Sequence, residues 1–209
     1  MKMHRAAVLL LALAACAETP SDDPGTKPDA GPLPEGELQP LAVGRTWTYV
    51  GSLGEKQVRT ISGRESVGRF ECFVYEIRTG AVVQRLWVRA EADGLKHYRV
   101  QVNEQPFVDL DDPAIHFPLP AKAGTRWEYE VGGLFPVNYS GKVEAVETVD
   151  VPAGSFRCLR VRTTGTKDKV TITERIAWYA PGVGLVKEES TFNRGDGEER
   201  GVISLKETK

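Results

Sequence analysis

The stretch Ala123-Gly-Thr-Arg-Trp127-Glu-Tyr129-Glu-Val-Gly132 decides the fold, because an earlier stretch, Val43-Gly-Arg-Thr-Trp47-Thr-Tyr49-Val-Gly51, reads almost as its copy. In each stretch a glycine precedes the tryptophan by three positions, and a tyrosine follows it by two. Side chains alternate between the two faces of a β-strand, so each tryptophan and its tyrosine point to the same side. The two stretches therefore predict two strands that begin two related units.

The two stretches open a longer internal repeat. Phe70-Glu-Cys72 matches Phe156-Arg-Cys158, Trp87 matches Trp178, and Gly94-Leu95 matches Gly184-Leu185. The distance between the copies grows from 80 to about 90 residues, as small insertions in loops would produce, since loops accept length changes more readily than strands do. We expect one β domain at residues 38–209 with an internal duplication of about residues 40–102 and 120–206.

The rest of this domain also has the pattern of antiparallel strands. Val, Thr, Tyr, Phe and Trp recur in short runs broken by Gly, Pro or Asp, and no stretch of ten or more residues has a helical period. Strands are expected at residues 45–51, 56–64, 69–78, 82–90, 94–102, 125–131, 139–150, 156–164, 170–179, 184–192 and 200–206. The segment 105–120, with four prolines, is expected to bridge the halves. The predicted fold class is all-β, with about 10–11 antiparallel strands in two related halves that form a strongly curved sheet, an open barrel or a sandwich.

The N-terminus has the parts of a bacterial lipoprotein signal. Residues 1–15 contain a positively charged start, an apolar centre and small residues at the end, which is the pattern of a secretory signal peptide. Leu13-Ala-Ala-Cys16 resembles the lipobox of bacterial lipoproteins, in which the cysteine receives a diacylglyceryl group and becomes the first residue. Several acyl chains hold a protein on a membrane. We therefore expect a lipid anchor, including palmitate, at Cys16.

A tether is expected to follow the anchor. Residues 16–37 carry five prolines among small and polar residues, a composition that cannot bury enough apolar surface to fold. In the lipoproteins that the lipobox resembles, Ala17 rather than Asp after the cysteine favours export to the outer membrane. The expected location is therefore the outer membrane, with the domain at the periplasmic face or the cell surface.

Three runs resemble the motifs of bacterial lipoproteins and secreted β-domain proteins that carry a domain of unknown function. The runs are Gln39-Pro-Leu-Ala-Val-Gly-Arg-Thr-Trp-Thr-Tyr49, Val151-Pro-Ala-Gly-Ser-Phe-Arg-Cys-Leu-Arg-Val161 and Trp178-Tyr-Ala-Pro-Gly-Val-Gly-Leu-Val-Lys187. The resemblance covers most of residues 38–206. It implies an exported β domain and implies no catalytic residues.

Charge and hydropathy exclude some classes of partner. The formal net charge is -2, and the Lys and Arg residues are interleaved with acids, which gives no electrostatic case for nucleic acid. The longest apolar run, Ala6 to Ala15, is too short for a membrane-spanning helix. We expect the membrane to be a partner only through the lipid anchor, and the sequence identifies neither a protein nor a small-molecule partner.

Two cysteines remain after Cys16. In an exported protein an even pair suggests a disulfide, and Cys72 and Cys158 occupy equivalent positions in the two halves. A twofold arrangement could bring them together or leave them on opposite sides. In each strand the neighbours Phe73, Tyr75 and Ile77, or Leu159 and Val161, form the more apolar alternate set, which places the cysteine on the other face.

No cofactor and no metal site is expected. Asp109, Asp111, Asp112 and His116 could be drawn as ligands of a cation, but acids before a proline are more typical of a turn. The histidines of the mature chain are His97 and His116. A hydrolase that uses the Asp109–His116 region is one functional alternative.

The chain carries no nucleophile elbow, phosphate-binding glycine loop or zinc-ligand spacing, and we expect no catalytic residues. Trp47, Trp87, Trp127 and Trp178 are interpreted either as core residues or as the lining of a ligand cavity. The leading interpretation is a non-enzymatic, membrane-anchored lipoprotein with a binding or structural role in the envelope. The alternatives are a carrier of an apolar ligand in an aromatic-lined β cavity and the hydrolase.

Overall fold

The computed structural model describes residues 33, 36–131, 137–193 and 197–209. Residues 1–32, with the expected signal peptide, Cys16 and most of the tether, lie outside the described residues. The described residues form twelve β-strands and no α-helix. The strands are β1 (Thr46–Gly51), β2 (Lys56–Val67), β3 (Phe70–Thr79), β4 (Val82–Glu91), β5 (Gly94–Val102), β6 (Val108–Pro118), β7 (Arg126–Val131), β8 (Val137–Val151), β9 (Gly154–Lys167), β10 (Val170–Ala180), β11 (Gly184–Asn193) and β12 (Glu198–Thr208).

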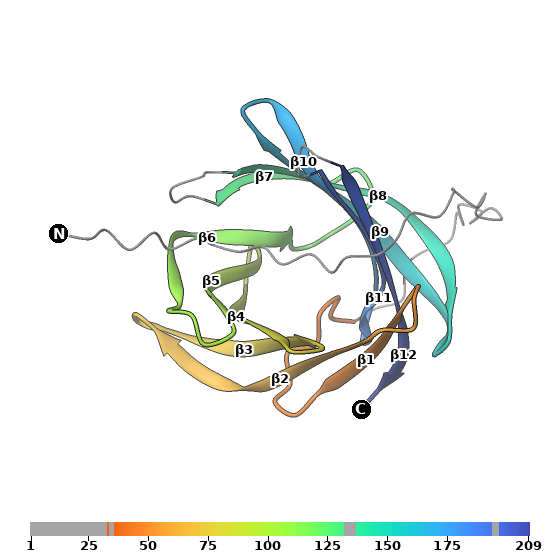
Figure 1. Cartoon of the computed structure of the whole chain (residues 1–209), viewed down its shortest axis with the longest axis horizontal. Helices are drawn as coiled ribbons and strands as arrows, with labels where there is room; N and C mark the ends of the chain where they lie inside the picture. Colours follow the sequence, from red (N-terminus) through yellow and green to blue (C-terminus); the bar gives the residue numbers. More distant parts are fainter. Residues whose placement is uncertain (1–32, 34–35, 132–136, 194–196) are drawn as a thin grey trace.

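All twelve strands belong to one antiparallel sheet in which neighbours in sequence are neighbours in space. The order is β6-β5-β4-β3-β2-β1-β12-β11-β10-β9-β8-β7, so the first and last strands pair in the middle of the sheet. The edge strands β6 and β7 contact each other without pairing. The sheet thus curls into an up-and-down barrel that is nearly closed and has one unsealed seam, as Figure 1 shows. The all-β prediction is confirmed, and the open barrel is the correct one of its three alternatives.

Strand β6 was missed by the sequence analysis, which assigned residues 105–120 to a bridge. Two of the four prolines of this segment lie in β6, Pro113 inside the strand and Pro118 at its end. Pro113 lies where the pairing of β5 with β6 is irregular, between the pairs Arg99–Asp109 and His97–Ala114. A proline cannot donate to a strand ladder, so prolines in sheets occur at edges and bulges. Strand β6 has both features, which explains why its composition does not read as a strand.

One face of every strand packs into the barrel interior. The main apolar core includes Tyr75 and Leu159, whereas Cys72 and Cys158 lie in two smaller clusters. This alternation confirms the expected placement of both cysteines on the face opposite the more apolar set.

Matching irregularities occur in the two halves. Gly44 and Gly124 both have φ near 90°, a conformation that favours glycine, and their N–H groups donate to Ile61 O and Val143 O at 2.8 and 2.9 Å. The ladders shift register just after Ile61 in β2 and just after Val143 in β8, and again at Trp87–Val88 in β4 and Trp178–Tyr179 in β10. The internal duplication itself stays a prediction.

The folded part of the chain begins before residue 38. Leu33 and Glu37, which we expected in the tether, pack on the domain: Leu33 contacts the main core, and Glu37 O accepts a hydrogen bond of 2.8 Å from Gly182 N. Leu38 is buried. The segment Gly36–Leu41 therefore belongs to the barrel and lies against one end of it.

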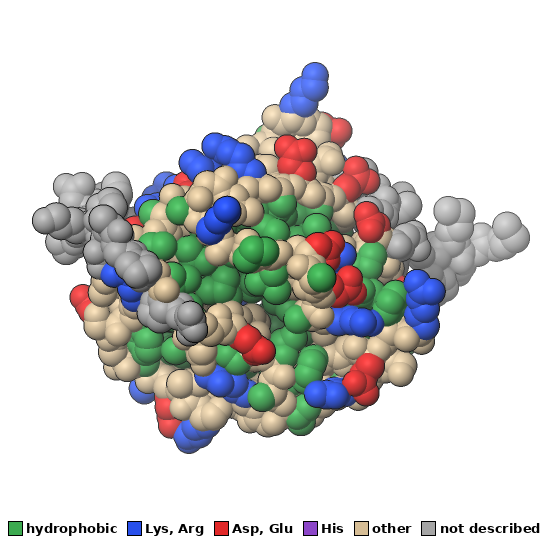
Figure 2. Space-filling view, turned by 180° about the vertical axis from the view of Figure 1, so that it is seen from behind, with side chains coloured by type: hydrophobic (Ala, Val, Ile, Leu, Met, Phe, Trp, Pro, Cys, Tyr) green, Lys and Arg blue, Asp and Glu red, His purple; other side chains and the backbone are tan. Residues whose placement is uncertain are grey.

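The described residues include no helix long and apolar enough to cross a membrane. Figure 2 shows one face of the molecule, with hydrophobic side chains gathered near its centre and charged side chains mostly around them.

Candidate functional site: a cavity inside the barrel

The barrel interior contains a cavity of about 460 Å³. Small-molecule sites in proteins span roughly 300–1,000 Å³, so this space is large enough for a ligand. Residues of nine strands and of the segment before β1 line this cavity: Gln39, Leu41, Gln57, Arg59, Tyr75, Ile77, Val82, Gln84, Leu86, Val88, Leu95, His97, Val100, Val102, Leu110, Ala114, His116, Tyr129, Val131, Tyr139, Arg175, Tyr179 and Glu188.

The lining changes in character along the barrel axis. In an up-and-down barrel the hairpins alternate between the two ends, so the turns that follow the odd-numbered strands share one end. Val82, Val102 and Val131 lie beside these turns and give the cavity apolar walls there. The charged lining residues Arg59, Arg175 and Glu188 lie inside their strands, away from the turns. We call these three residues and the histidines His97 and His116 the polar belt.

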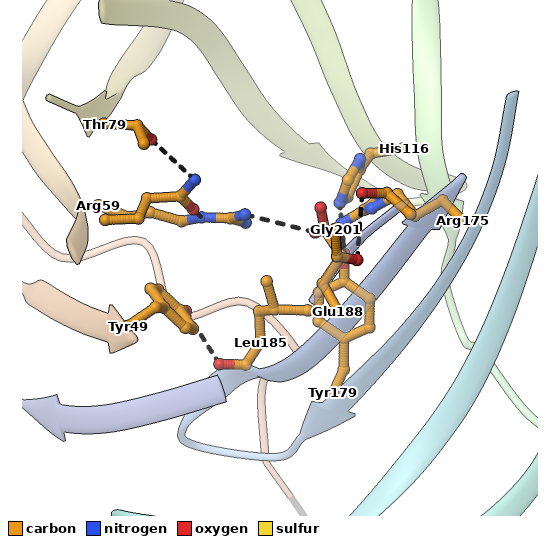
Figure 3. Close-up of polar contacts among 11 residues, drawn as sticks. Tyr49, Arg59, Thr79, His116, Arg175, Tyr179, Leu185, Glu188 and Gly201 are labelled. Carbon is orange, nitrogen blue, oxygen red and sulfur yellow. Dashed lines mark hydrogen bonds and ion pairs between the residues drawn. The ribbon is translucent and has the colours of Figure 1, made fainter. Parts of the chain in front are cut away.

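An ion-pair network forms the polar belt (Figure 3). Glu188 Oε2 accepts from Arg175 Nη2 at 2.8 Å and from Arg59 Nη2 at 3.3 Å. Arg59 Nε also donates to Gln57 Oε1 at 2.6 Å, and the Arg59 guanidinium lies 5.0 Å from the centre of the Tyr49 ring. Charged groups inside a protein need such partners, because their desolvation is costly.

Tyr179 extends the network to the edge strand β6. Its hydroxyl accepts a hydrogen bond of 2.8 Å from Arg175 Nη2 and lies 2.8 Å from His116 Nε2. The His116 ring stacks on His97 with ring centres 4.9 Å apart. The belt thereby connects β10 and β11 to β5 and β6 across the inside of the barrel.

The surroundings fix the charge of each group in the belt. Burial raises the pKa of Glu188, but Arg175 and Arg59 outweigh this effect and hold the pKa at about 2. Burial lowers the pKa of Arg175, while Glu188 and Tyr179 raise it above its usual value. Burial and the Arg175 charge lower the pKa of His97 to about 4, and burial with the neighbouring His97 and Arg175 lowers that of His116 well below 6.5. Near neutral pH both histidines are therefore uncharged.

A second cavity, of about 520 Å³, lies against the segment Gly36–Leu41. Its lining is mainly apolar and includes Leu38, Phe73, Phe117 and Leu119. Gln39, Leu41 and Leu95 line both cavities, so the two cavities adjoin at these residues. Gln39 Nε2 is buried and has no hydrogen-bond partner in the described part of the chain.

The structure places the four tryptophans in packed regions. Trp47 is fully buried, its Nε1 donates to Val183 O at 2.6 Å, and its ring meets Tyr75 edge to face. Trp127 is also buried and packs over Gly141, where a Cβ atom would lie 2.2 Å from the indole ring. Among the described residues that line the two cavities there is no tryptophan.

Trp87 and Trp178 lie in the two smaller clusters. Trp87 Nε1 donates to Glu65 Oε2 at 2.8 Å, and Trp178 Nε1 donates to Glu147 Oε1. Arginine guanidinium groups lie over both rings, Arg99 over Trp87 and Arg160 over Trp178. A cavity of the size that the carrier alternative requires is present, but the aromatic residues on its walls are tyrosines and histidines, not tryptophans.

The two cysteines that follow Cys16 are free thiols. Cys72 and Cys158 are fully buried in separate clusters, so the structure does not form the disulfide that their equivalent positions suggested. Burial raises the pKa of the Cys158 thiol to about 12, with a further contribution from Glu147.

The Asp109–His116 region is divided by the barrel wall. Asp109 pairs with Arg99 and is half exposed, while His116 points into the cavity. Asp112 is exposed, and the side chain of Asp111 lies outside the described residues. Within the described part of the chain no group of three or more His, Cys, Asp or Glu residues could hold a metal ion.

The sequence analysis missed the charged residues of the belt. A signal was present: Arg59 lies two residues before the buried Ile61, and Arg175 lies two and four residues before the buried Ala177 and Tyr179. A charged residue in the apolar alternate positions of a strand points into the interior.

Comparisons with known proteins find one family model and two solved structures. The family model described as DUF3108-like matches residues 139–198, less than a third of the chain, and supports the resemblance to a domain of unknown function. A comparison with curated proteins finds no match. A candidate lipoprotein from Parabacteroides distasonis has a TM-score of 0.40 and 15% identity, and covers 82% of this chain and 98% of its own. A candidate exported protein with a YmcC-like fold, from Bacteroides fragilis, has a TM-score of 0.41 and 17% identity, with the same coverage.

Proposed function

We propose that this chain is a lipid-anchored protein of the bacterial envelope that binds a small, largely apolar molecule inside its barrel and does not transform it. The cavity of about 460 Å³ carries this proposal. A packed β domain has few voids larger than a water molecule, so a space of this size with apolar walls is typical of a binding site. The cavity is lined by aliphatic residues, tyrosines and the polar belt rather than by the tryptophans expected from the sequence.

The arrangement of polar groups favours binding over hydrolysis. A hydrolase needs a base near the attacked bond, and the geometry of the Asp109–His116 region is unsuited to this role because Asp109 is bound to Arg99 on the other side of the wall. Glu188 is held ionised by two arginines, which makes it a weak base. Both features support a binding protein.

The cavity is tested by filling it. In the chain beginning at Ala17, which keeps every described residue, Val100→Phe places a larger side chain in the cavity. We expect the wild-type chain to bind Nile red, a neutral apolar dye, in detergent-free buffer and Val100→Phe to bind it at least tenfold more weakly. Val170→Phe, the same exchange at an exposed position, serves as the control and should bind as the wild type does. Equal binding by all three chains, or none by the wild type, would overturn the proposal.

The anchor rests on Leu13-Ala-Ala-Cys16 alone. The mature protein should partition into detergent and carry a lipid-modified Cys16, and Cys16→Ser should release it or leave it unprocessed. An unmodified Cys16 in the intact mass of membrane-extracted protein would refute the anchor.

A further inference from the structure

The polar belt carries one more positive charge than negative charge. Of the described residues that line the cavity, the charged side chains are Arg59, Arg175 and Glu188. The two histidines are uncharged near neutral pH, and burial raises the pKa of the lining tyrosines Tyr75, Tyr129, Tyr139 and Tyr179, so these stay neutral as well. An uncompensated charge within a protein is costly, and a bound anion would remove the imbalance.

Arg175 is the residue that faces the empty space. Its two hydrogen bonds, to Glu188 and Tyr179, both leave from Nη2, and no bond from Nε or Nη1 is present within the described residues. Its side chain retains 26% exposure although it lies deep inside the protein, so the exposed part faces the cavity. The Arg59 side chain retains only 8% and is covered by Gln57, Tyr49 and Glu188. The guanidinium of Arg175 therefore keeps two nitrogens for a ligand.

The neighbours of Arg175 restrict the position of an anion. Glu188 would repel it, but this carboxylate is already bound by two guanidinium groups on the Nη2 side of Arg175. Burial and the Arg175 charge lower the pKa of His97 and His116, so both rings are uncharged near neutral pH. They therefore neither attract nor repel an anion strongly. The accessible donors are Nη1 and Nε of Arg175, which lie on different edges of the guanidinium, and each can donate a charge-assisted hydrogen bond to an oxygen of a carboxylate or a phosphate.

The rest of the cavity is suited to hydrocarbon. Val82, Val102, Leu110 and Val131 form the wall toward the turns that follow the odd-numbered strands. Leu86, Val88 and Leu95 form the wall on the other side of the belt. A chain of methylene groups placed along either wall would be removed from water, which favours binding.

We infer that the cavity binds a molecule with one anionic head group on a single hydrocarbon chain, with the head hydrogen-bonded to the free N–H groups of Arg175. This inference rests on the proposed function and adds the class of ligand to it. A free fatty acid and a lysophospholipid with a terminal phosphate share this chemistry, and the experiment distinguishes the two sources.

The test measures three ligands with the same tail by titration calorimetry, below their micelle concentrations, at pH 8. The ligands are tetradecanoate, tetradecanol and a lysophosphatidate with a tetradecanoyl chain. Charge-assisted hydrogen bonds to a buried group predict that the wild-type chain binds one or both anions at least about tenfold more tightly than the alcohol. The stronger of the two anions identifies the source.

Variants at Arg175 test whether this residue binds the anionic head group of the ligand. In Arg175→Met the preference for the anion should fall to about onefold, whereas Arg175→Lys should keep most of it. Arg78→Met removes an exposed arginine and should bind as the wild type does. If Arg175→Met fails to fold, the comparison of the three ligands in the wild type still tests whether the cavity prefers an anionic head group, and Arg175→Lys still tests the role of the charge at this position.

The three ligands and the variants distinguish a failure of this inference from a failure of the proposed function. If the alcohol binds as tightly as both anions, the anionic head is wrong and the proposed function stands. If Arg175→Met folds and keeps the full preference, the assignment to Arg175 is wrong. If none of the three ligands binds, the proposed function itself fails.

Discussion

Glu188 Oε2 lies 2.8 Å from Arg175 Nη2, inside a barrel whose other walls are largely apolar. Removal of one partner from a buried ion pair leaves a charge without compensation and typically costs about 3–5 kcal/mol. We therefore predict that Glu188→Gln, which leaves Arg59 and Arg175 facing each other, lowers the free energy of unfolding by about 3 kcal/mol in urea titrations. Glu189→Gln, the next residue, removes a partly exposed ion pair with Lys187 and should cost less than about 1 kcal/mol. Equal losses in the two variants would contradict the belt as a buried network.

The stability should fall as the pH falls from about 6.5 to 4, because of His97 and His116. Burial and Arg175 lower the pKa of His97 from 6.5 to about 4 in the folded protein, so the unfolded chain takes up its proton first. Because the pKa of His97 is lower in the folded than in the unfolded chain, the neutral imidazole stabilises the fold fully above about pH 6.5. This contribution is lost as the pH falls from about 6.5 to about 4. At 1.36 kcal/mol for each unit, His97 contributes up to about 3 kcal/mol.

The measurement is the free energy of unfolding between pH 7 and pH 5, above the range of ordinary carboxylates. His97→Gln should flatten this dependence, and the histidine pKa values from NMR should lie below 6.5. A dependence as steep in the variant as in the wild type would show that His97 is not the cause.

Trp87 and Trp178 allow a matched comparison. Both donate a hydrogen bond to a glutamate, but Glu65 is exposed whereas Glu147 retains only 2% exposure. When the indole N–H is removed, the Glu65 carboxylate can be hydrated and the Glu147 carboxylate cannot. We predict that Trp178→Phe lowers the free energy of unfolding by about 1–3 kcal/mol more than Trp87→Phe does, measured by urea unfolding. A larger loss in Trp87→Phe would be inconsistent with these two environments.

Trp47 and Trp127 begin the two halves and are both core residues, but their surroundings differ. Trp47 is bound to Val183 O, whereas Trp127 Nε1 is buried and has no partner in the described residues. Truncation of a buried tryptophan typically costs about 3–5 kcal/mol. We expect Trp47→Ala to fall at the upper end of this range and Trp127→Ala at the lower end. Thermal unfolding measures both, and a loss below about 1 kcal/mol in either would contradict its place in the core.

The strands were predictable because their side chains alternate in chemistry as well as in direction. All eleven predicted strands are present, each within a few residues of its expected bounds. Strand β6 was not predictable from composition, since its prolines are acceptable only at an edge, and edge positions follow from the closure of the whole sheet. The choice of a barrel over a sandwich likewise depends on the pairing of β1 with β12, whose residues lie more than 150 positions apart.

The site was less predictable than the fold. The tryptophans and the Asp109–His116 region stand out by residue type. They were therefore interpreted as a candidate ligand lining and a candidate hydrolase site. The belt is assembled from arginine and glutamate residues that resemble surface charges when each strand is read alone. Arg59, on β2, and Glu188, on β11, meet only because β1 and β12 bring the two halves together. The local signal was the place of Arg59 and Arg175 in the apolar alternate positions of their strands.

The most direct test of the account is to locate a ligand in the crystal. Tetradecanoate with a bromine atom at the end of its tail would be bound to the chain beginning at Ala17, and the bromine would be located by anomalous diffraction. We expect bromine density inside the barrel, against the apolar wall, with the carboxylate bound to the N–H groups of Arg175 that no protein group uses. Bromine density confined to the outer surface, or a barrel interior filled only with ordered water at saturating ligand, would contradict this expectation.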